Sequence, residues 1–236
     1  MKLKSIRLPE TDLANLAFRD TAFKTKFLMN WLQPKQVKGS YEPVRRSLGE
    51  AANVGLPLIP HIEVTTLGQL EQLVIKECRG NPDLVAMNLA PVRAIRDFID
   101  KNDVEADFLQ DLPITLYPNM RYSFWSPILI RYAGVARIVF MDMRRTGRLT
   151  PSGLHMAFSV VHERFRTLST EFESVRAEAW RFANTDARKI SVVKEWAAPI
   201  PFRDIVADTA ETYGILNRLR SAQTPKTGTD DGPLFA

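Results

Sequence analysis

Apolar residues in the first hundred positions of the chain recur at the three- and four-residue spacing of helices. This spacing predicts one helix over 10–32, a second over 67–78 and a third over 83–102, which restarts at Pro91 as a first-turn proline. Four prolines and three glycines fall within 34–60, so this stretch is predicted to be an irregular connection. The first part of the chain is therefore expected to be mainly helical.

From residue 112 the pattern changes to the alternation of apolar and polar positions that is typical of β-strands. Short alternating runs are separated by residues that favour turns. The predicted strands are 113–117, 121–130, 135–143, 174–183 and 188–195. They are expected to form one sheet.

Two helices interrupt and follow these strands. The clearest helix of the chain spans 151–168: Thr150 is a capping residue, Pro151 suits the first position, and an apolar stripe ends at Leu168. The last helix follows Pro201. The order β-β-β-α-β-β-α predicts an α+β fold, with a mostly antiparallel sheet in the C-terminal half that helices cover on one face.

These changes of pattern divide the chain into three parts. Residues 1–110 are predicted to form a mainly helical N-terminal region, and residues 111–221 an α+β sheet domain. Residues 222–236 are rich in Thr, Gly, Pro and Asp and have no periodicity, so they are predicted to be a disordered tail.

The composition is that of an ordinary globular protein, since 45% of the 236 residues are hydrophobic and 25% are charged. The lone cysteine, Cys78, excludes an intrachain disulfide and a cysteine-based zinc site. No apolar stretch approaches the roughly 18 residues of a membrane span. We therefore expect a cytoplasmic protein with no membrane partner. The sequence has no glycine-rich phosphate loop, nucleophile elbow or H-E-x-x-H motif, so we also expect no cofactor.

Basic residues concentrate in two segments, 24–48 and 121–148, and the net charge is +5. The second segment also holds aromatic residues, and arginine binds phosphate while exposed aromatic rings stack on bases. The leading hypothesis is a non-catalytic, bacterial-type protein that binds the phosphates of DNA or RNA. A solvated or salt-bridged surface is the alternative. The candidate phosphate-binding residues are Lys35, Lys38, Arg45, Arg46, Arg121, Arg137, Arg144, Arg145 and Arg148.

Two carboxylates suggest a second hypothesis, a metal-dependent nuclease. Asp142 and Glu178 lie on neighbouring predicted strands and could hold Mg²⁺ between them and a substrate phosphate. The lysine that such nucleases place two residues after the glutamate is missing, because position 180 is tryptophan. Salt bridges from Asp142 to nearby arginines are the structural alternative. Whether the protein is an enzyme therefore stays open.

A third hypothesis is a protein–protein adaptor that uses the helix over 151–168 or the tail. The last residues, Gly-Pro-Leu-Phe-Ala, resemble the short C-terminal peptides with which bacterial replication and repair proteins dock on the sliding clamp. In that family a terminal Leu-Phe pair fills an apolar pocket, which implies docking through Leu234 and Phe235. The tail departs from the family pattern at Asp231, where glutamine is usual, and at Gly232, where leucine is usual.

Overall fold

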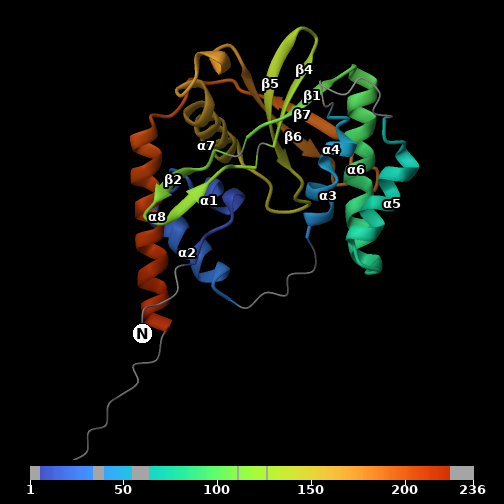
Figure 1. The fold of residues 1–236 in the computed structure, drawn as a ribbon. Helices are drawn as coiled ribbons and strands as arrows, with labels where there is room; N and C mark the ends of the chain where they lie inside the picture. Colours follow the sequence, from blue (N-terminus) through green and yellow to red (C-terminus); the bar gives the residue numbers. More distant parts are fainter. Residues whose placement is uncertain (1–5, 34–39, 55–63, 111, 126, 224–236) are drawn as a thin grey trace, which may run out of the picture.

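The computed structural model describes residues 6–33, 40–54, 64–110, 112–125 and 127–223 (Figure 1). Three sets of predicted features lie outside these residues: the basic residues Lys35 and Lys38, the docking pair Leu234 and Phe235, and the tail from residue 224 onward.

A five-stranded sheet forms the centre of the molecule (Figure 1). In spatial order its strands are β1 (Glu105–Phe108), β4 (Ile128–Tyr132), β5 (Val135–Asp142), β6 (Arg176–Phe182) and β7 (Ile190–Lys194). All neighbours are antiparallel except β5 and β6, which are parallel because a helical crossover connects them. The predicted α+β class with a mostly antiparallel sheet in the C-terminal half is confirmed.

Two details of the strands differ from the prediction. The run 121–130 is two strands, β3 (Met120–Tyr122) and β4, because the backbone turns at Phe124, where φ is +45°. β1 has no predicted counterpart: its four residues bury only Ala106, so they lack the alternation that marks a half-buried strand.

One face of the sheet packs against helices from both ends of the chain. These are α1 (Glu10–Leu16), α2 (Thr21–Trp31), α7 (Pro151–Val161) and α8 (Phe202–Gln223), together with the hairpin of β2 (Ile114–Tyr117) and β3. A π-helical turn (His162–Arg166) and a short 3-10 helix (Thr170–Phe172) follow α7. Asp20 caps α2 through the backbone N–H of Phe23, and Thr150 caps α7 through that of Gly153.

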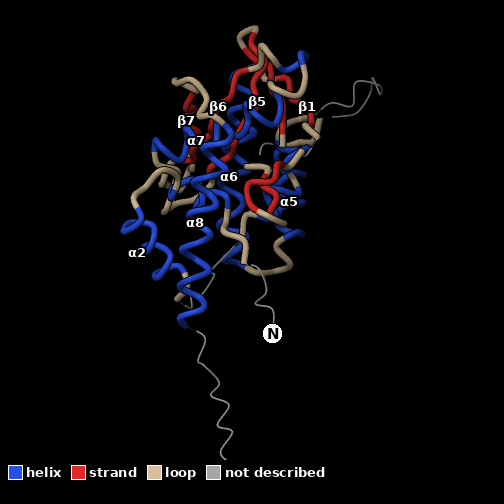
Figure 2. The backbone as a smooth tube through the Cα atoms, turned by 90° about the vertical axis from the view of Figure 1, so that its left-hand side faces the viewer, coloured by secondary structure: helices blue, strands red, loops and turns tan. Residues whose placement is uncertain are grey.

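The opposite face packs against helices from the N-terminal half alone. They are α3 (Glu42–Arg46), α4 (Leu48–Ala51), α5 (Leu67–Glu77) and α6 (Pro82–Asn102). The predicted restart at Pro91 is wrong, because α6 continues through that buried proline. The two groups of helices lie on opposite sides of the sheet in Figure 1, and Figure 2 shows the strands in red among the blue helices.

Helices thus cover both faces of the sheet, where the sequence pattern predicted cover on one face. The burial pattern of β5 gives the reason, since its last six residues are all buried and neither side of the strand meets solvent. Residues on both sides of position 110 contribute to both hydrophobic clusters. The division of the chain into two domains at that position stays a prediction.

No helix among the described residues has both the length and the apolar character needed to cross a membrane. The expected cytoplasmic location stays a prediction.

Candidate partner-binding site

The two candidate metal ligands, Asp142 and Glu178, point to opposite faces of the sheet. Asp142 ends β5 two residues after Phe140, which packs with the α7 and α8 side, while Trp180, two residues after Glu178, packs with the α5 and α6 side. Glu178 is also paired in register with Val139, three positions from Asp142. The sheet separates the two carboxylates, so they cannot share a metal ion, and the nuclease hypothesis has no geometric basis.

Glu178 belongs to a buried polar cluster that supports the sheet. Its carboxylate accepts hydrogen bonds from the indole N–H of Trp180 at 2.8 Å and from the hydroxyl of Tyr132 at 3.0 Å, and it pairs with Arg137 at 3.2 Å. Burial raises the pKa of Glu178, although these three partners oppose the rise. Burial, and after it the neighbouring Glu178, raises the pKa of Tyr132 to about 12.

Asp142 has a different environment, at the end of β5. Its Oδ2 accepts the backbone N–H of Leu149 at 3.0 Å, whereas its Oδ1 has no hydrogen-bond partner among the described residues. Burial raises the pKa of this carboxyl. Within the described part of the chain, no group of three or more His, Cys, Asp and Glu side chains could hold a metal ion. The expectation of no cofactor stays a prediction.

Several of the candidate phosphate-binding arginines are committed to the fold itself. Arg137 is buried and donates to the backbone carbonyls of Tyr132 and Val135. Arg148 donates to the carbonyls of Arg144 and Phe182, and so ties the loop after β5 to the end of β6.

The remaining candidates divide into paired and unpaired side chains. Arg144 pairs with Asp12, and Arg46 pairs with Glu42 and Glu77. The other three are solvent-exposed, and none has a carboxylate partner among the described residues; they are Arg45, Arg121 and Arg145.

A cleft brings one arginine from each basic segment of the chain toward the end of β5. It has a volume of about 520 Å³. Arg45 comes from α3 and stacks over the ring of Trp125 at 4.9 Å, while Arg144 follows β5. Asp142 lies in the wall of the cleft. The other lining residues that bear on the argument are Arg7, Leu8, Glu10 and Tyr41.

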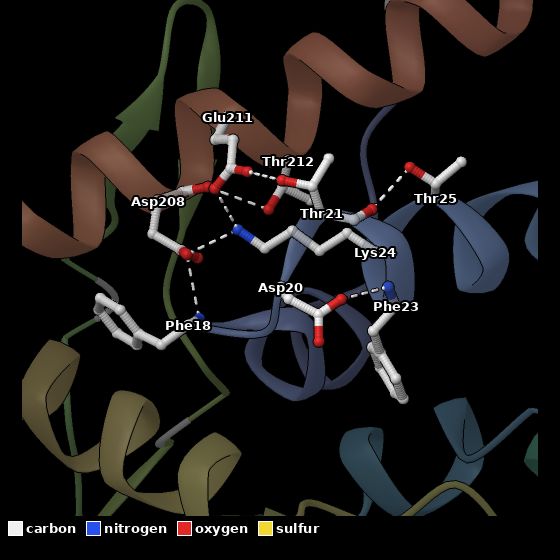
Figure 3. Close-up of polar contacts among 9 residues, drawn as sticks. All are labelled: Phe18, Asp20, Thr21, Phe23, Lys24, Thr25, Asp208, Glu211 and Thr212. Carbon is white, nitrogen blue, oxygen red and sulfur yellow. Dashed lines mark hydrogen bonds and ion pairs between the residues drawn. The ribbon is translucent and has the colours of Figure 1, made fainter.

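The C-terminal helix α8 is fixed to the body by a buried lysine (Figure 3). Lys24 of α2 has no solvent-exposed surface, and its Nζ lies 2.6 Å from Oδ1 of Asp208 and 2.8 Å from Oε2 of Glu211. Asp208 also accepts the backbone N–H of Phe18, and Glu211 accepts the hydroxyl of Thr21. These contacts hold the two helices together and so fix α8 against the rest of the protein.

A second polar contact holds the middle of α8. The hydroxyl of Tyr213 accepts the backbone N–H of Leu8 at 2.9 Å and shares a hydrogen bond with the hydroxyl of Tyr122. The ring of Tyr213 also stacks on that of Tyr117, with centroids 4.5 Å apart. Leu8 lines the cleft, so this contact links the middle of α8 to a residue of the cleft wall.

The helix α7 offers no docking surface of the kind the adaptor hypothesis considered. Eight of its eleven residues are buried, from Gly153 to Val161 with the exception of His155. Leu168, predicted to end its buried stripe, is instead 68% exposed, because the π-helical turn shifts the phase of the side chains. The adaptor hypothesis named this helix and the tail as docking elements, and the tail is the one that remains a candidate.

The structure is that of an α+β protein with a cleft at the end of β5. A family model described as "Sliding clamp-binding bacterial toxin SocB" matches residues 11–222, which is most of the 236-residue chain. The chain belongs to this SocB family. No curated protein and no solved structure gives a significant match.

The family overturns the leading hypothesis drawn from the sequence. A sliding clamp-binding family indicates a protein partner, so the hypothesis of a DNA- or RNA-binding protein is wrong, and the adaptor alternative fits better. In the structure, three of the candidate arginines, Arg137, Arg144 and Arg148, are engaged by the protein's own carboxylates and carbonyls. The expected bacterial type agrees with the family.

The residues that fix α8 are not evident from the charge pattern of the sequence. Lys24 falls within the basic segment 24–48, yet it lies on the same helical stripe as Leu28 and Trp31, at spacings of four and seven. A lysine on an apolar stripe requires a buried partner. That signal predicts an ion pair, but its partners, Asp208 and Glu211, are about 185 positions away and only the structure identifies them.

Proposed function

We propose that this protein binds the bacterial sliding clamp and that Leu234 and Phe235 are the side chains that enter the clamp. The family match carries the proposal, since the family is described as binding the clamp. The resemblance of the tail to clamp-docking peptides supports the same partner independently, because residues 224–236 lie beyond the matched region.

The placement of α8 suits this role. Lys24 and Tyr213 hold the helix against the body, and the tail begins directly after Gln223, where the helix ends. A tethered segment that leaves a fixed helix can enter a pocket on a partner while the body stays outside it. Figure 1 shows α8 along one side of the molecule, with its C-terminal end away from the sheet.

The energetics predict a modest affinity for such a segment. Burial of a leucine and a phenylalanine side chain contributes about 1.5–3 kcal/mol each. Ordering the tail opposes part of this gain. Asp231 and Gly232 replace the usual glutamine and leucine, so their contributions are lost. Together the two side chains contribute about 3–6 kcal/mol before the cost of ordering, so by themselves they support a dissociation constant no tighter than roughly tens of micromolar.

Binding at this pocket provides a physical basis for toxicity. Replication and repair proteins of the resembled class use the same pocket, so a protein that occupies it excludes them by competition. The toxic effect then depends on the concentration of the protein relative to its competitors and on the two affinities.

The test is a calorimetric titration of the full chain against a purified bacterial sliding clamp. Replacing Leu234 and Phe235 together by alanine is expected to weaken binding at least tenfold, since about 1.4 kcal/mol corresponds to a factor of ten. The control replaces Thr227 and Thr229 by alanine in the same tail and is expected to bind like the parent.

The outcomes separate the parts of this proposal. No binding by the parent at clamp concentrations up to about 1 mM, a ceiling of about −4.1 kcal/mol, contradicts clamp binding altogether. Equal binding by the parent and the Leu234/Phe235 variant contradicts these two side chains as the docking element and indicates that the chain docks through other residues.

A further inference from the structure

We propose that the cleft at the end of β5 binds the acidic and apolar segment Asp230–Phe235 of the same chain. In this closed state the docking pair, Leu234 and Phe235, is withheld from the clamp. The inference rests on the proposed function and adds an intramolecular competitor to it. The charge of the cleft, its aromatic wall and the length of the tail support it.

The charge of the cleft suits an acidic segment. Its lining side chains include Arg7, Arg45 and Arg144 against Glu10 and Asp142. Arg7 is paired with Glu10 at 3.0 Å, but Arg45 has no carboxylate partner among the described residues. Asp230 and Asp231 are adjacent carboxylates and the most acidic feature of the tail. An arginine guanidinium binds a carboxylate through two parallel hydrogen bonds, so Arg45 is the natural partner for one of them.

The cleft also holds surfaces for the apolar pair. Trp125 lies on its wall beneath Arg45, and Tyr41 lies beside them. Its volume of about 520 Å³ falls within the range of ligand-binding clefts, roughly 300–1,000 Å³. Aromatic walls favour leucine and phenylalanine side chains, which gain about 1.5–3 kcal/mol each when they leave water.

The tail is long enough to return from the end of α8 to the level of Leu8 in the cleft wall. Tyr213 contacts Leu8, and Gln223 ends the helix ten residues later, about 15 Å further along the axis. Seven extended residues, from Gln223 to Asp230, span about 23–25 Å, which exceeds this axial distance.

The first test is a nuclear magnetic resonance measurement on the full chain without clamp. A spin label is attached to a cysteine introduced by Thr229→Cys; Cys78 is 1% exposed and stays unlabelled. We expect the label to broaden the indole signal of Trp125 and the amide signal of Ser123, independently of protein concentration. Arg45→Glu is expected to remove the broadening. The matched control Arg203→Glu, at an 88% exposed side chain on α8, is expected to retain it.

The second test is clamp affinity, measured with the same two variants. If the closed state holds about 70–90% of the molecules, Arg45→Glu tightens clamp binding about three- to tenfold, while Arg203→Glu leaves it unchanged.

Three results would overturn the inference while leaving clamp binding intact. The first is that the signal of Trp125 is not broadened. The second is that Arg45→Glu and Arg203→Glu change the broadening equally. The third is that the broadening increases with protein concentration, which would identify a second copy of the chain as the occupant of the cleft. Loss of all clamp binding by the parent contradicts the proposed function instead.

Discussion

Nζ of Lys24 lies 2.6 Å from Oδ1 of Asp208, across 184 positions of the chain. The pair joins the second helix to the last, and the lysine has no contact with solvent. Removing one partner of a buried ion pair leaves the other charge buried and unpaired. The stability lost in this way is larger than the net stability that the intact pair contributes. The attachment of α8 to the rest of the protein therefore depends on this pair.

Lys24→Met is expected to destabilise the protein by about 2–4 kcal/mol, because it leaves Asp208 without its cation in a site only partly open to water. Glu211 is 46% exposed and is expected to contribute little of this loss. Urea denaturation measures the change. Lys26→Met, at an exposed position of the same helix, is the control and should change stability by less than about 0.5 kcal/mol. A second substitution, Asp208→Asn, should recover part of the loss; strict additivity of the two changes would show that they do not interact.

Tyr213→Phe is expected to cost about 1–3 kcal/mol, because the variant leaves the buried backbone N–H of Leu8 without an acceptor and the hydroxyl of Tyr122 without its partner. Tyr117→Phe is the matched control, because its hydroxyl makes only a 3.4 Å contact with the exposed Asn217. Hydrogen exchange of the Leu8 amide provides a local readout, and protection equal to that of the parent would contradict the assigned bond.

Asp142→Asn is expected to change how stability depends on pH. Burial raises the pKa of Asp142 in the folded state, so between the ordinary carboxyl pKa and the raised value the folded protein holds a proton that the unfolded chain has released. Stability from this group therefore falls as pH rises through that window. The variant keeps an oxygen for the N–H of Leu149 and lacks the charge. Its stability relative to the parent should be higher at about pH 7 than at about pH 4, and an equal difference at both values would argue against a raised pKa.

Arg137→Met and Arg131→Met separate a buried arginine from an exposed one near the same strand pair. Arg137 is 7% exposed and neutralises Glu178, so its loss should cost about 3–5 kcal/mol. Arg131 has a 53% exposed side chain and pairs with Asp107 at the surface, where such a pair contributes roughly 0–1 kcal/mol. Guanidinium denaturation compares the two variants. Similar losses for both would show that Arg137 does not stabilise the buried carboxylate.

Local structure follows from the sequence where a repeating pattern carries the information. The helix that begins at Thr150-Pro151, the strand that ends at Asp142 and the last helix after Pro201 each follow from spacing and capping within a few neighbouring residues. Strand β1 and the helical cover of the second sheet face do not follow from the sequence. Strand β1 is too short to show a pattern, and the cover depends on which helices pack against that face of the sheet.

By itself, the sequence determined the α+β class, the long helices and strands, and the Leu234-Phe235 pair whose resemblance to clamp-docking peptides agrees with the family. Only the tertiary structure decided that Asp142 and Glu178 face apart, that Lys24 is buried against Asp208, and that Arg45 and Asp142 share a cleft. The reason is physical: periodicity and capping act between residues a few positions apart, whereas the burial and partner of a charge depend on which distant segments pack against it.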